Sequence, residues 1–118
     1  MSGNQSQQVV EQYLHEALMG GSPEALEATV SDSGLKRIIA LFWSAFADRR
    51  ITVRQIFTSA DGQLVAAHVS MEARHVGPWL TIEPTGKTVT LEGTGLLRVT
   101  EGKIAEFWIS WDWLPLLR

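Results

Sequence analysis

The sequence predicts an α+β fold in which a curved antiparallel sheet packs on a group of N-terminal helices. Apolar residues recur at spacings of three and four as far as residue 46, which is typical of helices. From residue 51 onward, β-branched and aromatic residues form runs separated by Gly-containing turns, which is typical of strands. Helices that precede a sheet, without alternation, argue against a parallel-sheet protein. A chain of 118 residues fits a single domain over residues 1–118.

Three helices are expected before the sheet. The first has one apolar face and ends at Gly20-Gly21, and its face is formed by Val9, Val10, Tyr13, Leu14, Ala17 and Leu18. Ser22-Pro23-Glu24 combines an N-cap, a proline at the first helical position and an acid near the positive helix end, so a short second helix should run to about Val30. The third helix is expected to end near Ala47-Asp48, with its apolar face formed by Leu35, Ile38, Ile39, Phe42 and Phe46.

Four strands are predicted in the second half of the chain, over residues 51–58, 63–75, 87–99 and 103–111. Their turns contain Asp61-Gly62, Thr85-Gly86 and Glu101-Gly102. Gly93 and Gly95 lie inside a strand, where glycine marks a bulge or a bend.

Side-chain alternation divides the strands into two faces. In strand 63–75 one face is apolar and ends in a histidine: Val65, Ala67, Val69, Met71, Ala73 and His75. The opposite face is more polar: Ala66, His68, Ser70, Glu72 and Arg74. The last strand is ambiguous because large aromatic residues lie on both faces, with Trp108 and Asp112 on one and Phe107 and Trp111 on the other.

Composition and motifs exclude several function classes. A net charge of -3 with scattered Lys and Arg residues gives no basic surface for nucleic acid. The chain has no Cys, and its three His residues lack metal-ligand spacing, so no metal site is expected. Nucleotide-binding glycine patterns and a serine nucleophile motif are missing as well, so no cofactor is expected.

The N-terminal segment suggests a cytoplasmic protein. Residues 1–8 are polar and uncharged, without the basic and apolar parts of a secretory signal. No apolar run approaches the ~20 residues that cross a bilayer, so no membrane association is expected.

Asp112 is the strongest candidate for chemistry. It follows the last strand and is surrounded in sequence by three of the five tryptophans, Trp108, Trp111 and Trp113. Burial among apolar groups disfavours a charged carboxylate and raises its pKa, which suits an acid/base group. His75 ends another long strand and could form an acid/base pair with Asp112 over one pocket. The alternative is that Asp112 caps the turn before Leu114-Pro115 and that His75 satisfies a local hydrogen bond.

Two stretches of the chain resemble SnoaL-like polyketide cyclases. Arg74-His75-Val76-Gly77-Pro78-Trp79, followed by Glu83-Pro84-Thr85-Gly86-Lys87-Thr88-Val89, is similar to the family's "G-T-H-x-G-x-(F/W)…P-T-G-K-x-V" signature. Residues 97–108 and 112–117 resemble the family's "R-x-x-x-G-K-I-x-E-x-W…D-x-x-x-L-L" ending. The break between the first two helices is also similar, so the resemblance covers most of the chain.

The resemblance implies a nuclear-transport-factor-like cone, with helices closing the mouth of a curved sheet, often as a homodimer joined through the sheet's outer face. It also implies that Asp112 acts as acid/base in a cofactor-independent, intramolecular aldol closure and that His75 is the pocket histidine. Residues 27–35 join the second and third helices almost directly, where the family has a longer polar loop, so a pocket residue is missing.

The leading hypothesis is therefore a cofactor-independent cyclase of bacterial secondary metabolism with a polyketide-like substrate. Asp112 and His75 would be catalytic, and the apolar pocket would be shaped by Trp108, Trp79, Phe42, Met71, Tyr13 and Phe46. Epoxide opening, pyran formation, isomerisation and pericyclic cyclisation are alternatives on the same fold. Epoxide opening would need a second pocket aspartate, for which Asp48 is the candidate. A non-catalytic ligand-binding or dimerisation domain is the other alternative.

Overall fold

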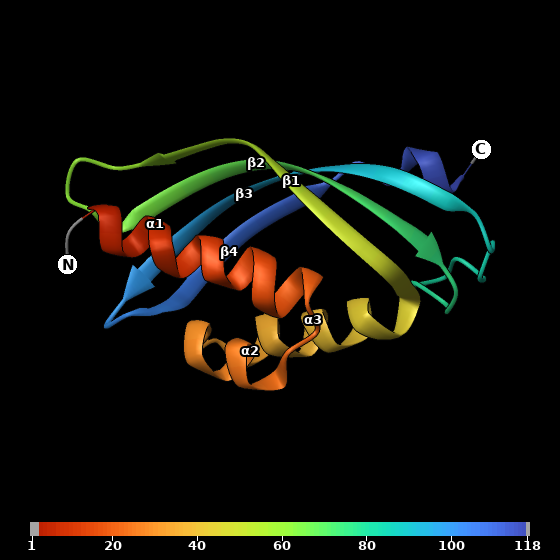
Figure 1. The fold of residues 1–118 in the computed structure, drawn as a ribbon, viewed down its shortest axis with the longest axis horizontal. Coiled ribbons are helices and arrows are strands. Elements are labelled where there is room, and N and C mark those ends of the chain that lie inside the picture. The colour runs from red at the N-terminus through yellow and green to blue at the C-terminus, as the bar shows by residue number, and fades with distance from the viewer. Residues whose placement is uncertain (1–2, 118) are drawn as a thin grey trace.

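The computed structural model describes residues 3–117 and contains one curved, antiparallel sheet with helices on its concave side (Figure 1). The strands are β1 (Phe46–Thr58), β2 (Leu64–His75), β3 (Thr88–Thr100) and β4 (Lys103–Trp111), and they lie in the order β1-β2-β3-β4. The helices precede the sheet in the chain and lie under it, so the expected α+β architecture is confirmed.

The first helical segment changes its winding half way along. An α-helix, α1 (Gly3–Gln12), continues directly into a π-helix, η1 (Tyr13–Met19). The π-helix buries Tyr13, Leu14, Ala17 and Leu18, the same apolar positions that the sequence pattern indicates. Gly21, with a φ of 69°, ends the segment in the left-handed region, where glycine carries no steric cost.

The next two helices begin at side-chain caps. The Ser22 hydroxyl accepts a hydrogen bond from the Ala25 N–H at 3.1 Å and opens α2 (Pro23–Thr29). The Asp32 carboxylate accepts one from the Leu35 N–H at 2.9 Å and opens α3 (Ser33–Ala45). Residues 30–32 join the two helices, and Val30 bridges to Ile104 of β4.

The third helix ends earlier than expected, at Ala45, and Phe46 is already the first residue of β1. The reason lies in the turn after β2, where the N–H groups of Val76 and Gly77 both donate to the Ala45 carbonyl, at 2.8 and 3.1 Å. Phe46 then pairs with His75 at the start of the sheet. Long-range hydrogen bonds therefore set this boundary rather than helical periodicity.

The sheet carries no bulge at Gly93 or Gly95, so of the two expected features, a bulge or a bend, the bulge is absent. β2 and β3 pair in unbroken register from Leu64–Arg98 to Arg74–Thr88. Register shifts occur instead between Ala47 and Arg50, between Val53 and Gln55, and between Arg98 and Val99.

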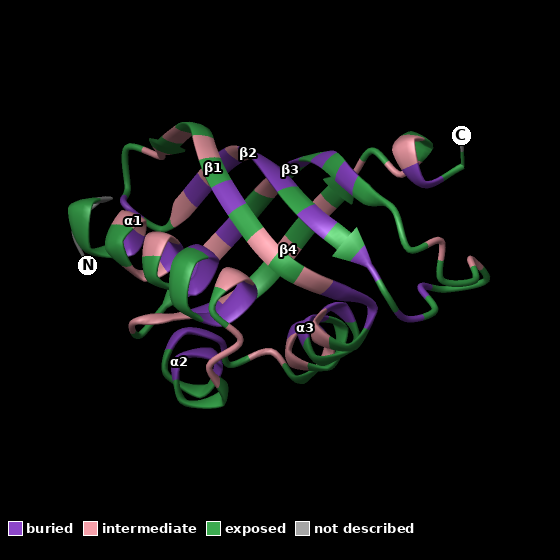
Figure 2. Cartoon of the chain, turned by 45° about the vertical axis from the view of Figure 1, so that its right-hand side comes forward, coloured by how far each residue is buried: buried purple, intermediate pink, exposed green. Residues whose placement is uncertain are grey.

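Burial alternates along β2 as the pattern predicts (Figure 2). Val65, Ala67, Val69, Met71, Ala73 and His75 are all buried on the concave face. The outer face is more exposed, apart from Ser70, which is also buried. In β4 the concave face carries Phe107, Ile109 and Trp111, while Trp108 lies on the outer face.

A search of residues 3–117 for a helix able to cross a bilayer finds none with the required length and apolar character.

Candidate functional site

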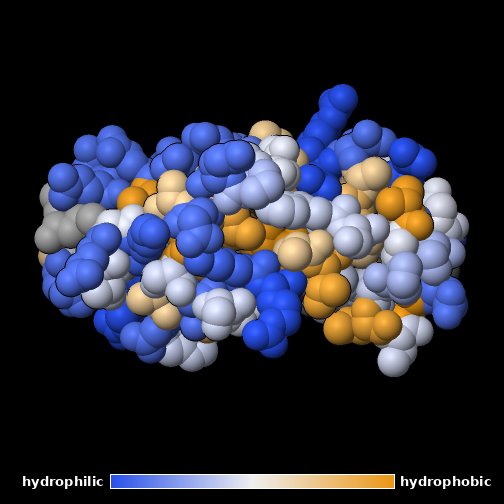
Figure 3. All heavy atoms as spheres, turned by 90° about the horizontal axis from the view of Figure 1, so that it is seen from below, coloured by the Kyte–Doolittle hydropathy of each residue, from blue (hydrophilic) through white to orange (hydrophobic). Residues whose placement is uncertain are grey.

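A cavity of about 430 Å³ lies between the concave face of the sheet and the helices η1 and α3. Its wall is mainly apolar and is drawn from six parts of the chain. The helices contribute Tyr13, Leu14, Leu18, Leu35, Ile38, Ile39 and Phe42, and the strands and the segments beyond them contribute Ala67, Val69, Trp79, Gly93, Thr94, Gly95, Leu97, Phe107, Ile109, Ser110, Trp111 and Trp113. Seen from the helical side, hydrophobic residues reach the surface in the middle of the molecule and towards the end opposite the N-terminus (Figure 3).

The cavity remains open because small residues occupy the centre of the concave face. Ala67 of β2 pairs with Gly95 of β3, which pairs with Ile109 of β4. In the next inward-facing row, Val69 pairs with Gly93, and Gly93 with Trp111. Larger side chains at the two glycines would fill the space between sheet and helix. Gly95 thus leaves cavity space above β3, while the space above Gly93 is taken up by the Trp111 indole.

Aromatic rings close one end of the cavity. Phe42 of α3 lies at centroid distances of 4.8 Å from Trp79, 5.6 Å from Trp111 and 6.1 Å from Trp113. Trp79 and Trp113 lie 5.2 Å apart. These tilted and edge-on arrangements are favourable for aromatic pairs, so the four rings stabilise one another at this end of the cavity.

Tyr13 supplies a polar group within this apolar wall. The residue is 2% exposed and lines the cavity, and its hydroxyl has no hydrogen-bond partner among residues 3–117. Burial raises the pKa of the Tyr13 phenol well above its ordinary value of 10.0. At neutral pH the group is therefore a neutral hydroxyl that can donate a hydrogen bond to a ligand oxygen.

His75 is completely buried at the end of β2, behind the aromatic cluster rather than in the cavity wall. Its ring stacks on Phe46 at 5.3 Å, and its Nδ1 accepts a hydrogen bond from the Thr85 N–H at 3.2 Å. Because Nδ1 accepts, the neutral ring carries its proton on Nε2. That Nε2 and the buried Trp79 Nε1 have no hydrogen-bond partner among the described residues.

Asp112 lies outside the cavity, so the expectation that it projects into a poorly hydrated pocket is wrong. The residue is exposed, and its Oδ1 accepts a hydrogen bond from the Leu114 N–H at 3.1 Å. This bond caps the turn that leads into the 3-10 helix η2 (Leu114–Leu116), which is the alternative stated for this residue. The physical reason is strand alternation: Trp111 and Trp113 line the cavity, and the residue between them faces away.

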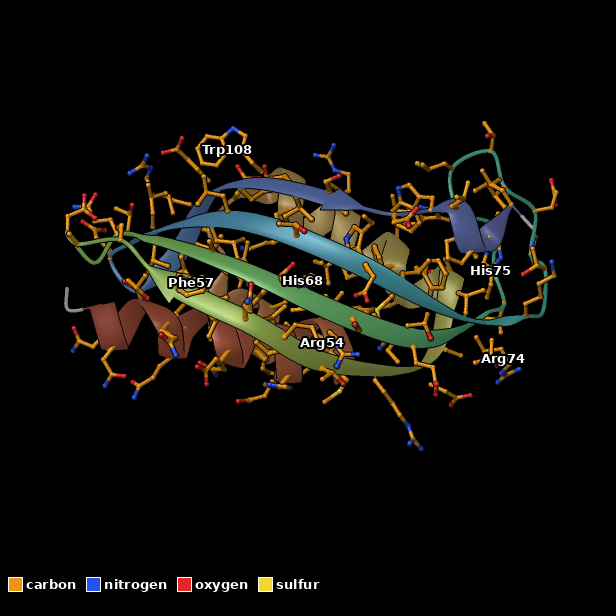
Figure 4. All side chains as sticks on the ribbon, turned by 90° about the horizontal axis from the view of Figure 1, so that it is seen from above. Arg54, Phe57, His68, Arg74, His75 and Trp108 are labelled. Carbon is orange, nitrogen blue, oxygen red and sulfur yellow. The ribbon has the colours of Figure 1, made fainter. Side chains whose placement is uncertain are left out.

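Three of the aromatic and apolar residues expected around a pocket do not line this cavity. Trp108 is 52% exposed on the outer face of β4 and projects away from the helices (Figure 4). Met71 and Phe46 are fully buried but pack beyond the cavity wall. Tyr13, Phe42 and Trp79 do line it.

Several wall residues were not identified from the sequence, notably Trp111, Trp113, Gly93 and Gly95. A usable signal was the placement of Gly93 in one strand and Trp111 in the next, since an aromatic ring commonly covers a glycine across a strand pair.

Carboxylates are missing from the described wall. Within residues 3–117, the cavity lining contains no Asp, Glu, His, Lys or Arg. Asp48, the candidate second aspartate, is exposed and forms an ion pair with Arg74 at 3.2 Å. The described residues also hold no group of three or more His, Asp or Glu residues suited to a metal.

The fold and the cavity define a small α+β domain with a partly open, mainly apolar cavity between its sheet and its helices. The chain belongs to the SnoaL-like polyketide cyclase family, whose model matches residues 3–118. A search of curated proteins finds no match.

Solved structures with the same fold cover nearly the whole chain. TsrD from Streptomyces laurentii has a TM-score of 0.84 at 22% identity, with 98% of this chain and 94% of that chain covered. AclR, a putative hydroxylase from Streptomyces galilaeus, has a TM-score of 0.80 at 21% identity, with 98% and 95% covered. IdmH, a putative polyketide cyclase from Streptomyces antibioticus, has a TM-score of 0.75 at 21% identity, with 95% of each chain covered.

Proposed function

We propose that this protein binds a polyketide-like substrate in the cavity and promotes its ring closure by cofactor-independent acid/base chemistry of the aldol type. The observation that carries the proposal is the apolar cavity of about 430 Å³, which is within the range of small-molecule sites. Membership of the SnoaL-like polyketide cyclase family supports the choice of substrate class.

The cavity can contribute by folding the substrate and by stabilising developing charge. In an aldol closure, a carbon between carbonyl groups loses a proton, the enolate carbon attacks a ketone carbon, and the new alkoxide takes up a proton. Confinement of a flexible chain in one conformer brings the two carbons together. The neutral Tyr13 hydroxyl is placed to donate a hydrogen bond to a substrate oxygen as negative charge develops there.

Asp112 is the proposed base, and its position imposes a condition on the mechanism. Its neighbours Trp111 and Trp113 both line the cavity, whereas Asp112 itself is exposed and faces away from it. To reach a substrate it must leave the Leu114 N–H and turn inward.

Two substitutions at Asp112 test the role of its charge. An asparagine keeps the hydrogen bond to the Leu114 N–H but has no base, whereas alanine loses both. Each variant is incubated with linear and partly cyclised poly-β-keto esters, and products are followed by mass spectrometry. The proposal expects Asp112→Asn to fold like the wild type and to lose about 10² to 10⁴ in turnover. Full turnover by Asp112→Asn would remove Asp112 from the mechanism.

A non-catalytic binding domain is the second candidate, because no carboxylate or histidine lines the described cavity. In that case the wild type binds the same esters without turnover, and Asp112→Asn binds them equally well. Epoxide opening is less well supported, since Asp48 is paired with Arg74 away from the cavity.

We also propose that two copies associate through the outer face of the sheet. An apolar row crosses the outer face of the sheet and is named here the outer-face row. Its members pair consecutively across all four strands and are Phe57, Ala66, Leu96 and Trp108. Arg98 and Glu106 form an ion pair at 3.0 Å on one side of it, and His68, Arg54 and Glu92 lie on the other. Figure 4 shows Phe57 and Trp108 on the two edge strands. An apolar row flanked by charges of both signs can match a second copy of itself.

A further inference from the structure

We propose that Gly93 is a positioning residue of the cavity: by leaving space above β3, it lets the Trp111 indole lie flat against the sheet, and this sets the width available to planar ligands. The inference rests on the proposed ligand-binding function of the cavity and adds to it the residue pair that determines ligand size and shape.

The contact between the two residues is unusually close. Gly93 and Trp111 are direct partners across β3 and β4. A Cβ atom placed on Gly93 would lie 2.6 Å from both Cε3 and Cζ3 of the indole and 2.9 Å from its Cδ2. These distances are well inside van der Waals contact, so any side chain at residue 93 must displace the ring.

The displaced ring must move off the sheet, towards α3 and the cavity. The sheet lies behind it, and Phe42 faces it at a centroid distance of 5.6 Å, with Trp113 at 6.3 Å. All three rings line the cavity. A ring lifted off β3 therefore moves into the cavity and narrows the gap between β4 and α3. In the native arrangement a flat, conjugated ring can lie in the cavity against the part of the indole that Phe42 does not cover.

Gly95 provides a matched comparison two residues away. It lies on the same face of β3 and lines the same cavity, but its added Cβ would approach no atom closer than 3.4 Å, the distance to Ile109 Cγ1. Neither glycine has a positive φ, so alanine is free of backbone strain at both positions. The two Gly→Ala changes therefore differ in one respect, the displacement of an indole ring.

The Tyr13 hydroxyl independently indicates a ligand in this space. It belongs to a residue that is 2% exposed, lines the cavity and has no hydrogen-bond partner among the described residues. A planar ligand with a carbonyl oxygen could lie against Trp111 and accept a hydrogen bond from this hydroxyl.

The test measures binding rather than turnover, so its result does not depend on the catalytic proposal. The probes are 1,4-naphthoquinone and 9,10-anthraquinone, which are neutral, planar and differ by one fused ring. Affinities are measured by calorimetry for the wild type, Gly93→Ala, Gly95→Ala, Trp111→Leu and the double variant Gly93→Ala/Trp111→Leu. Urea unfolding of each variant establishes that it is folded.

Gly93→Ala is expected to weaken anthraquinone binding about tenfold or more and naphthoquinone binding much less, because the larger ring system needs the full width. Gly95→Ala should weaken either probe by no more than about threefold, since it adds a methyl group without moving a ring. Removing the indole should relieve the clash, so the double variant should bind anthraquinone no more weakly than Trp111→Leu alone.

Three results would overturn the inference. One is equal loss of affinity in the two Gly→Ala variants, which would mean that only cavity volume matters. Another is that Gly93→Ala still weakens anthraquinone binding when it is added to Trp111→Leu. This comparison also tests the inference if the single variant Gly93→Ala does not fold. The third is that the wild type binds neither quinone, which would overturn the proposed binding function as well. If the wild type binds the quinones but does not turn over the poly-β-keto esters, only the catalytic proposal is overturned.

Discussion

At the scale of single residues, burial suppresses the charge of Tyr13, the one titratable side chain in the described cavity wall. Its phenol is enclosed by apolar residues of η1, α3 and the sheet and has no described partner that would stabilise a negative charge. Loss of its proton in the folded protein would place a phenolate in an apolar environment. The neutral form is thus favoured far above neutral pH, as a hydrogen-bond donor requires.

This burial predicts a specific dependence of stability on pH. The folded pKa of Tyr13 lies above the unfolded value, so its contribution to stability is complete below the ordinary tyrosine pKa. As pH rises past that value, the unfolded chain loses the proton while the folded chain keeps it, and the free energy of unfolding falls by up to about 1.4 kcal/mol per pH unit.

The measurement is direct because Tyr13 is the only tyrosine of the chain. Tyrosinate absorbance should appear near the ordinary pKa in urea but only at higher pH in the folded protein. Urea unfolding between pH 9 and about pH 11 should show a steeper loss of stability in the wild type than in Tyr13→Phe. Coincident titration of the folded and unfolded chains would contradict the burial of the phenol.

The positions of Asp112 and Trp108 show which residue-level features follow from sequence. Alternation correctly separated the two faces of β2, because one face was apolar and the other polar. It could not decide between the faces of β4, where each has a large aromatic residue. Asp112 was misjudged because neighbours in sequence alternate between faces of a strand: Trp111 and Trp113 lie on the cavity side of the wall and Asp112 on the other.

At the scale of elements, a half-buried arginine, Arg49, joins the first helical segment to the sheet. The register shift between Ala47 and Arg50, with Asp48 at a φ of 54°, turns Arg49 towards the helices. Its guanidinium donates to the Leu18 and Met19 carbonyls at the end of η1, at 2.7 and 3.3 Å, and to the Phe46 carbonyl at 2.5 Å. These carbonyls lie where a helix end leaves acceptors without backbone partners.

Arg49→Met is therefore expected to destabilise the protein by about 2 to 4 kcal/mol, because it removes charged hydrogen bonds to partly buried carbonyls. The neighbouring Arg50 is exposed on the outer face, and Arg50→Met should change stability by no more than about 0.5 kcal/mol. Urea unfolding compares the two. A similar small effect for both variants would show that the helix end does not depend on Arg49.

Element boundaries were predictable where local signals define them. The Ser22 cap of α2 and the start of β4 at Lys103 follow from the sequence alone. The end of α3 and the three register shifts do not, because they depend on hydrogen bonds between segments far apart in the chain. The π-helical winding of η1 has no signal in the sequence pattern either. The glycines of β3 could be recognised as special, but their role depends on the indole that lies across from them.

At the scale of the whole molecule, the curved sheet separates two apolar regions with different roles. The concave face and the helices border the cavity. The convex face carries the outer-face row, in which Phe57 is 63% exposed, Trp108 52% and Leu96 39%. Both regions are apolar, which is why composition and periodicity could not assign Trp108 to the correct one.

If two copies associate through this face, the outer-face row lies at the centre of the contact. Trp108→Glu would place a carboxylate there twice, because a two-fold interface repeats every substitution. The dissociation constant of the dimer should rise by about a hundredfold or more, as expected for the loss of a central aromatic residue.

Size-exclusion chromatography with light scattering, over a range of protein concentrations, measures this change. Leu41→Glu is the matched control, since Leu41 is 55% exposed on α3, on the helical side of the molecule, and its replacement should leave the dimer intact. Dissociation by Leu41→Glu but not by Trp108→Glu would locate the contact on the helices instead. A wild type that remains monomeric at high concentration would contradict the dimer altogether and leave the outer-face row free for another partner.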